Sequence, residues 1–263
     1  MAIISTIFHI VLYQPFLNAL MVLYRFLGED MGIAIIVLTL IIKLVLFYPS
    51  LSQLKAQRSL QKTQPKLKEL KEKYKDDKEG YSKAVLAFYK ENKVNPLSSC
   101  LPLLIQLPIL IALYQVFIAG VVPDPKTGLL AANQLSSLYE PVRHFFTSTQ
   151  LHTMSLGLFD VAHKKNLILA FLAAAATYWQ SRMLMTPRPP KEAGKAGKDE
   201  DQMTAMNRNM VYFMPLVTFF FAYSFPTGLA LYWLVSTLFQ VLQQWYFLRR
   251  HPLTAPPANV QPK

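Results

Sequence analysis

The sequence is poor in charge and nearly free of cysteine. Of its 263 residues, 16% are charged and one is cysteine, whereas 52% are hydrophobic and the mean hydropathy is +0.24. Soluble globular domains carry about 25% charged residues, so this composition argues against that class. The lone Cys100 has no disulfide partner in the sequence and excludes a cysteine-ligated metal cluster, so we expect a small buried apolar residue there. The composition therefore indicates an integral membrane protein.

Two further absences narrow the function. Residues 1–27 have no basic start and no Ala-x-Ala-like site, so we expect no cleavable signal. The sequence has no Gly-x-x-x-x-Gly-Lys phosphate loop, and every histidine lies outside the stretches expected to cross the membrane: His9, His144, His152, His163 and His251. A nucleophile and its base are therefore not expected together in the membrane. We expect neither an enzyme nor a bound metal or cofactor.

Five stretches are apolar over roughly the 20 residues that a helix needs to cross a bilayer. They predict transmembrane helices at 29–49, 96–121, 165–186, 209–225 and 226–249. The breaker cluster Pro226, Thr227 and Gly228 predicts a tight turn that makes the last two antiparallel neighbours. The predicted fold class is an all-α integral membrane protein with five transmembrane helices.

Basic residues predict the orientation, because loops rich in Lys and Arg stay in the cytoplasm. The net charge is +12, and the basic residues gather in the segments 50–95, 187–208 and 250–263. The last two segments also lack apolar periodicity and predict a flexible cytoplasmic loop and tail. The loop 122–164 is poor in basic residues, so we expect it outside together with the N-terminus, although Lys164 and Lys165 run against the trend.

The first 28 residues are apolar enough for a sixth span, but polar residues interrupt them. Gln14, Asn18 and Arg25 share one helical face, and a second face carries apolar residues at a spacing of three or four: Phe16, Leu20, Leu23 and Leu27. That pattern favours an amphipathic helix lying in the outer interface over a sixth span.

Residues 50–95 predict a cytoplasmic helical hairpin. Apolar residues recur at helical spacing in two runs, and the runs are separated by a turn near 76–80: Leu67, Leu70 and Tyr74, then Tyr81, Val85 and Phe88. The remaining faces are charged, so the alternative is a solvated connector without a packed partner.

Lys43 is the unusual residue of the first predicted span. A lysine at the centre of a membrane helix costs about 2.5–3.5 kcal/mol, so it commonly faces a bundle interior or a watery cavity. Lys43 precedes Pro49 by six residues, which places it roughly 9 Å inside the cytoplasmic end at about 1.5 Å per residue. The alternative is that its long side chain reaches back to the headgroups.

Polar residues at a comparable depth favour a cavity. They occur on each of the five predicted spans: Thr39, Gln106, Thr177, Thr218, Ser236 and Gln240. Each alone could bond a backbone carbonyl or a neighbouring helix. Together they predict a wet, cationic groove in the cytoplasmic half of the bilayer, closed by apolar outer halves, which suits an incoming peptide better than a channel.

The chain resembles the YidC-type (YidC/Oxa/Alb) membrane protein insertases in three strings: GIAIIVLTLIIKLVLFYP at 32–49, NPLSSCLPLLIQLP at 95–108 and FPTGLALYW at 225–233. The resemblance covers about residues 31–248. It implies a five-helix core with a hydrophilic groove open to lipid and cytosol, an outer interfacial helix and a cytoplasmic hairpin. It also implies a multi-pass protein of the bacterial plasma (inner) membrane with a cytoplasmic C-terminus.

The resemblance also implies site residues and partners. Lys43 matches the family's groove cation, Thr39 and Gln106 match polar groove positions, and Tyr232 and Trp233 match an aromatic pair. The implied partners are nascent membrane proteins, the ribosome, the signal recognition particle receptor, the Sec translocon and anionic lipids, and no DNA. Ribosome or targeting contacts would come from the hairpin lysines: Lys62, Lys66, Lys68, Lys71, Lys73 and Lys75.

The sequence departs from the family pattern in three ways. The groove cation is usually arginine, whereas Lys43 lacks the guanidinium that binds carboxylates bidentately. The basic tail is short, and we expect no large outer domain. The competing function is a small transporter or channel that uses Lys43 as an anion or proton site, which would need polar residues in the outer halves of the spans.

Overall fold

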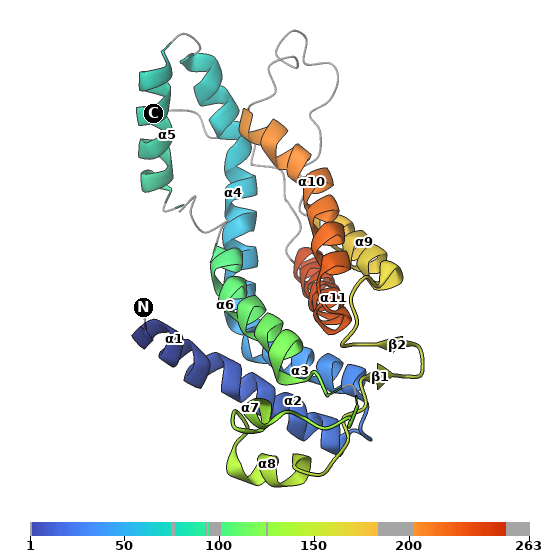
Figure 1. The fold of residues 1–263 in the computed structure, drawn as a ribbon. Coiled ribbons are helices and arrows are strands. Elements are labelled where there is room, and N and C mark those ends of the chain that lie inside the picture. Colours follow the sequence, from blue (N-terminus) through green and yellow to red (C-terminus); the bar gives the residue numbers. More distant parts are fainter. Residues whose placement is uncertain are drawn as a thin grey trace.

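The structure is a computed structural model that describes residues 2–74, 77–92, 94, 101–124, 126–183 and 202–250. Most of these residues are helical, as predicted, and two short strands are the exception (Figure 1). The predicted loop 187–208 lies outside the described residues up to 201, and its last part, 202–208, instead begins the helix α10 (Gln202–Ser224). The tail from 251 onward and Cys100 also lie outside the described residues.

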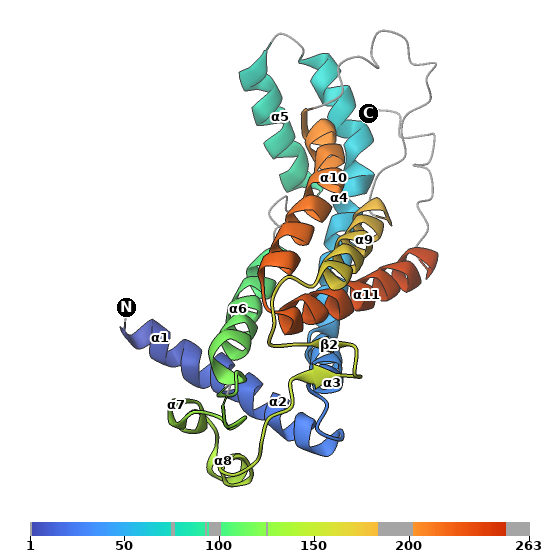
Figure 2. The same cartoon turned by 45° about the vertical axis from the view of Figure 1, so that its right-hand side comes forward.

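The N-terminal segment forms one long helix with a wide turn in its middle. It consists of α1 (Ala2–Phe8), the π-helix η1 (His9–Tyr13) and α2 (Gln14–Phe26). Pro15 has no N–H to donate, and the Gln14 N–H bonds to the carbonyl of His9, five residues back, so the wide turn accommodates the proline. The helix runs across the lower end of α3 and α6 in both views (Figures 1 and 2).

The buried face of this helix differs from the prediction. Asn18 was predicted on an outward polar face, yet its side chain is 3% exposed. Its Nδ2 donates to the carbonyls of Gln14 and Ser137, and its Oδ1 accepts from the Tyr139 N–H at 2.7 Å. A buried amide needs such partners, and the loop after α6 supplies them. The outward side near the N-terminus is instead apolar, with Ile3 and Ile7 exposed.

The first predicted span and the first hairpin arm are joined by a bend. Helix α3 (Met31–Val45) ends four residues before the expected boundary at 49, and α4 (Phe47–Lys73) continues from there to the far end of the arm. The bend is 63°. Pro49 lies in the first turn of α4, where its missing N–H costs no helical bond. The arm and the end of the predicted span are therefore one helix.

The second arm is α5 (Lys78–Glu91), which packs against α4 and begins at a capped turn. The Asp77 carboxylate accepts from the Gly80 N–H at 2.8 Å. An Asp cap satisfies a first-turn donor that has no partner within the helix. Helix α4 ends at Lys73 and α5 begins at Lys78, so the break between the arms lies next to the predicted turn near 76–80.

Helix α6 (Leu101–Gln115) contains Pro108 and continues into the π-helix η3 (Val116–Gly120). The loop that follows carries four short elements: α7 (Ala132–Leu135), α8 (Glu140–Phe146), β1 (Met154–Ser155) and β2 (Phe159–Asp160). The strands pair antiparallel, with Met154 opposite Asp160. Asp30, which caps α3, joins them to the bundle by accepting from Ser155 Oγ and the Leu156 N–H, each at 2.7 Å.

The last three helices are α9 (Leu167–Met183), α10 (Gln202–Ser224) and α11 (Thr227–Arg250). Helix α9 packs along both α10 and α11, which contact each other less and diverge after their join (Figure 2). The join itself is held by the loop that precedes α9, because the N–H groups of Thr227 and Gly228 donate to His163 and Val161. The turn was predicted, but α9 is the main neighbour of both helices.

The core lies toward the end away from α5, where α2, α3, η3 and α11 meet around Leu17, Met31 and Leu229 (Figure 1). At Gly228 an added Cβ would lie 2.8 Å from the Phe117 ring, so glycine is needed for this close approach. Large apolar side chains are also widely exposed, as lipid-facing helices require.

Length and apolarity test the spans only in part. Among the described residues, Ile3–Phe26 is long and apolar enough to cross a membrane, and so is the bent pair Met31–Val45 with Phe47–Thr63. Leu104–Gly120 and Asn209–Ser224 are shorter apolar helices. The five-span count and the interfacial position of the first helix stay predictions.

Candidate functional site

Lys43 lies between three helices in the interior of the bundle. Its side chain is 5% exposed, and its Nζ donates to Gln106 Oε1 of α6 at 3.5 Å. Gln106 Nε2 in turn donates to the Tyr232 hydroxyl of α11 at 2.6 Å. The first bond is long and weak, whereas the second is short. Lys43 is therefore not extended toward solvent in this structure, and Gln106 connects it to Tyr232.

The helices around Lys43 offer no opposite charge. The chain has no Asp or Glu in residues 31–68, 92–123, 161–191 or 202–263, which include α3, α6, α9, α10 and α11. A buried ammonium that has only a weak amide acceptor is poorly stabilised compared with one paired to a carboxylate. The site is thus cationic and has unused capacity for an anionic group.

Helix α11 contributes two of the predicted polar residues, Tyr232 and Ser236, to the site around Lys43. Tyr232 is buried and also hydrogen-bonds to Ser236, one helical turn further along. Trp233 is partly buried. We call Lys43, Gln106, Tyr232 and Ser236 the cationic cluster. Because Gln106 alone among them is partly exposed, access to Lys43 leads past α6.

The other predicted groove residues bond elsewhere. Thr39 Oγ1 donates to the carbonyl of Ile35 at 2.6 Å and Thr177 Oγ1 to that of Ala173 at 2.9 Å, each within its own helix. Thr218 is buried in α10. Gln240 Oε1 accepts from Gln180 of α9 at 2.7 Å. The structure therefore brings four of the predicted residues together, and a groove role for the remaining ones stays a prediction.

Sequence reasoning missed the continuation of the polar row on α11. Gln243 Oε1 accepts from Ser50 Oγ at 2.8 Å, and its Nε2 donates to the carbonyl of Phe47 at 3.2 Å, next to the bend between α3 and α4. Gln244 is also buried. The signal was available, since Tyr232, Ser236, Gln240 and Gln243 recur every three to four residues on one face.

The hairpin lysines are only partly free. Lys66 Nζ pairs with Glu69 at 2.6 Å, and Lys73 Nζ lies 5.7 Å from the Tyr74 ring centroid. Lys62 is exposed and Lys71 is partly buried. The side chain of Lys68 and all of Lys75 lie outside the described part of the chain. Their proposed contact with a ribosome or targeting factor stays a prediction.

Comparison with known proteins places the chain in a family. Residues 22–254 match the family described as "60Kd inner membrane protein". The chain is 32% identical over 248 residues to the membrane protein insertase YidC of Ectopseudomonas mendocina, covering 94% of this chain and 36% of that protein. It is 31% identical over 221 residues to the YidC of Fusobacterium nucleatum subsp. nucleatum, covering 84% of this chain and 87% of the relative.

A third relative, the YidC of Legionella pneumophila, is 30% identical over 238 residues, with 90% of this chain and 35% of the relative covered. The chain therefore spans about a third of two of these relatives and most of the third. The family match covers most of the chain, including every residue of the cationic cluster. The chain belongs to the YidC family of 60Kd inner membrane proteins.

Proposed function

We propose that this protein is an insertase and chaperone of the bacterial inner membrane, which receives transmembrane segments of nascent membrane proteins. The observation that carries the proposal is Lys43: a cation buried between α3, α6 and α11 on helices without a carboxylate. Its charge is available to a visiting group because no residue of these helices neutralises it. The family relatives bear the printed name membrane protein insertase.

The magnitude of the attraction fits the task. An acidic residue at the centre of a membrane helix costs about 2.5–3.5 kcal/mol on insertion scales. A carboxylate about 4 Å from the Lys43 ammonium gains about 4 kcal/mol at an effective dielectric constant of about 20. The cation therefore offsets the penalty for an acidic segment that passes through the cytoplasmic half of the bilayer.

Substrate entry requires the helices around Lys43 to separate, since only 5% of this side chain is exposed. The hydrogen bond between Lys43 and Gln106 must then break, and because it is 3.5 Å long, breaking it costs little free energy. The incoming segment then leaves laterally into lipid, along the exposed apolar faces of α9 and α10. We propose that the α4–α5 hairpin meets the ribosome, the signal recognition particle receptor or the Sec translocon, and that anionic lipids hold its basic residues.

The test is complementation after depletion of a host's native insertase. The host receives the wild-type chain, Lys43→Ala or Lys43→Arg, and insertion is followed for a small membrane protein whose translocated segment carries one acidic residue. We expect insertion with the wild type and with Lys43→Arg, which keeps the charge, and a loss on the order of tenfold or more with Lys43→Ala.

The matched control is the same substrate with its acidic residue changed to the corresponding amide. This substrate should depend on Lys43 far less, because it has no charge for the cation to attract. Failure of the wild-type chain to support insertion of either substrate, at normal expression, would contradict the proposed function. Equal insertion of the acidic substrate by wild type and Lys43→Ala would contradict the role of the cation.

A further inference from the structure

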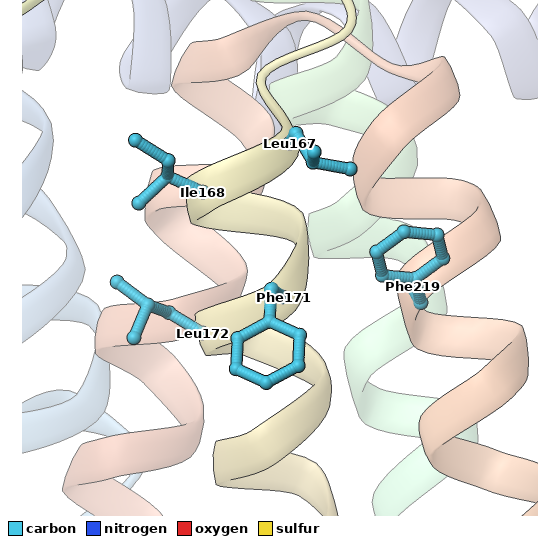
Figure 3. A pocket seen from close by; sticks show the side chains of 5 residues that line it. All are labelled: Leu167, Ile168, Phe171, Leu172 and Phe219. Carbon is cyan, nitrogen blue, oxygen red and sulfur yellow. The ribbon is translucent and has the colours of Figure 1, made fainter.

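A second feature lies on the lipid-facing side of α9, at the opposite end from the hairpin. Here a hollow of about 410 Å³ is lined by Leu167, Ile168, Phe171, Leu172 and Phe219. Figure 3 shows the first four side chains on α9, with Phe219 extending from α10 on the side of Leu167 and Phe171. Its volume is within the range of about 300–1,000 Å³ of small-ligand sites, and every lining side chain is apolar. The hollow alone suits any apolar occupant.

Two lysines just before the start of α9, near the hollow in the chain, narrow the choice of occupant. Lys164 and Lys165 are exposed, and they lie three and two residues before the first lining residue, Leu167. The Lys165 N–H donates to the carbonyl of Tyr223 on α10, one turn beyond Phe219, and Lys164 forms an isolated bridge with Pro226. The backbone that carries both amines is thus fixed to the end of α10 and to the turn after it, and it leads directly into α9.

The charge of these two lysines is not cancelled by their neighbours. The nearest acidic residue in sequence, Asp160, pairs with His163 Nδ1 at 2.9 Å. Within the described residues, neither Lys164 nor Lys165 forms an ion pair. These two lysines also interrupt the pattern in which basic residues keep to the cytoplasmic segments. The distribution of basic residues over the two sides of the membrane therefore does not explain these lysines, whereas an anionic ligand would.

We infer that this hollow binds one anionic phospholipid of the outer leaflet, with an acyl chain against Phe171 and Phe219 and the phosphate between the amines of Lys164 and Lys165. An apolar hollow preceded in the chain by two unpaired cations complements the two ends of such a lipid. A transmembrane peptide complements only the apolar part, and inorganic phosphate only the charged part. The leaflet rests on the proposed orientation, whereas the site itself does not require the insertase function.

The experiment is native mass spectrometry of the full-length chain released from nanodiscs that contain equal amounts of phosphatidylglycerol and phosphatidylcholine. We expect one retained phosphatidylglycerol per chain, and roughly a thirtyfold weaker retention in Lys164→Gln/Lys165→Gln, since each lysine near a lipid surface contributes a factor of about five. Leu172→Trp, which fills the hollow, should also release the lipid. Added inorganic phosphate should not displace it.

The matched control is Lys126→Gln, which removes an exposed cation from the same loop away from the hollow. It should retain the lipid like the wild type, and Lys43→Ala should do so as well, which keeps this test separate from that of the insertase function. Equal retention of both lipids, or an equal loss in Lys126→Gln, would overturn the inference. Displacement by phosphate would reduce the site to an anion site, and a dimer lost in Leu172→Trp would assign the hollow to a second copy; either result also overturns it.

Discussion

Replacing Gln106 by Glu should separate the stability of the protein from its insertion activity. The substitution keeps the size and shape of the side chain but turns a 3.5 Å amide contact with Lys43 into a contact between opposite charges. The Tyr232 hydroxyl, which now accepts from Gln106 Nε2, can rotate and donate to the new carboxylate. The local geometry therefore tolerates the change.

For folding, the Coulomb gain of the new charge pair and the cost of burying the carboxylate nearly cancel. The attraction between Lys43 and the substrate, in contrast, becomes weaker. At 3.5 Å and an effective dielectric constant of about 20, the new pair gains about 5 kcal/mol. Removing a carboxylate from water costs several kcal/mol, so the free energy of unfolding should change by less than about 2 kcal/mol. The same carboxylate cancels about half of the roughly 4 kcal/mol with which Lys43 attracts a substrate's acid. A loss of about 2 kcal/mol in this attraction corresponds to about thirtyfold slower insertion.

Two assays measure these effects. Thermal unfolding of the purified variant in detergent should give a midpoint near the wild-type value, while insertion of the acidic substrate at pH 8 falls about thirtyfold. Gln106→Met is the control, because it removes the amide and adds no charge, so insertion should fall much less. Wild-type insertion rates in a folded Gln106→Glu protein would refute the idea that substrates use the Lys43 charge.

Three further predictions concern the loop 122–164 and its contacts with α2 and α3. In Gly32→Ala the new Cβ would lie 1.9 Å from Ser155 Oγ, so the loop must shift, and we expect a loss of about 1–3 kcal/mol in unfolding free energy, partly restored by Ser155→Gly. Asn18→Leu leaves the Tyr139 N–H without its acceptor, and chemical denaturation should show a loss of about 1–3 kcal/mol. Burial alone would raise the pKa of Asp160, but hydrogen bonds from the Ala162 N–H and other donors outweigh it and hold the pKa below the usual value. The stability that Asp160 contributes is present above that usual value, near 3.9, and is lost as pH falls through the lower folded value, so Asp160→Asn should flatten the acid decline of the melting temperature.

Exposed residues of the same loop supply the controls. Asn133→Leu, an exposed substitution, should change the unfolding free energy by at most about 0.5 kcal/mol. Glu140→Gln, at a side chain that is 85% exposed, should likewise change the unfolding free energy by at most about 0.5 kcal/mol. Effects of these controls equal to those of Asn18→Leu and Asp160→Asn would show that the buried contacts are not the cause.

Much of the architecture follows from local properties of the sequence. Apolar length, the breaker cluster at Pro226 and the Asp pair before α5 predicted helices and breaks that the structure also contains, although α10 begins seven residues before the predicted 209. These features act over one or two helical turns, so the sequence displays them directly. The bend at Leu46 was not evident, because Pro49 marked a boundary that the structure places three residues earlier.

The sequence by itself also determined that Lys43 is the exceptional residue, since a lone cation in an apolar span is costly wherever the helix lies. Aligning the predicted spans by depth then predicted which polar residues lie near Lys43. Depth fixes a residue's height along a helix but leaves the direction in which the helix faces undefined. Thr39 and Thr177 have the right height and bond their own helices, whereas Gln106 and Tyr232 reach Lys43.

Only the tertiary structure decided that direction. The rotation of α11 about its axis is set in its first turn, where Gly228 approaches Phe117 and Ile35 closely enough to exclude a Cβ. That distant contact aims Tyr232 and Ser236 at the cluster and Gln243 at the bend. Asn18 shows the same principle in α2, because a loop more than a hundred residues later decides that its face is buried. Composition and spacing thus determine which groups are available, and long-range packing determines which of them meet.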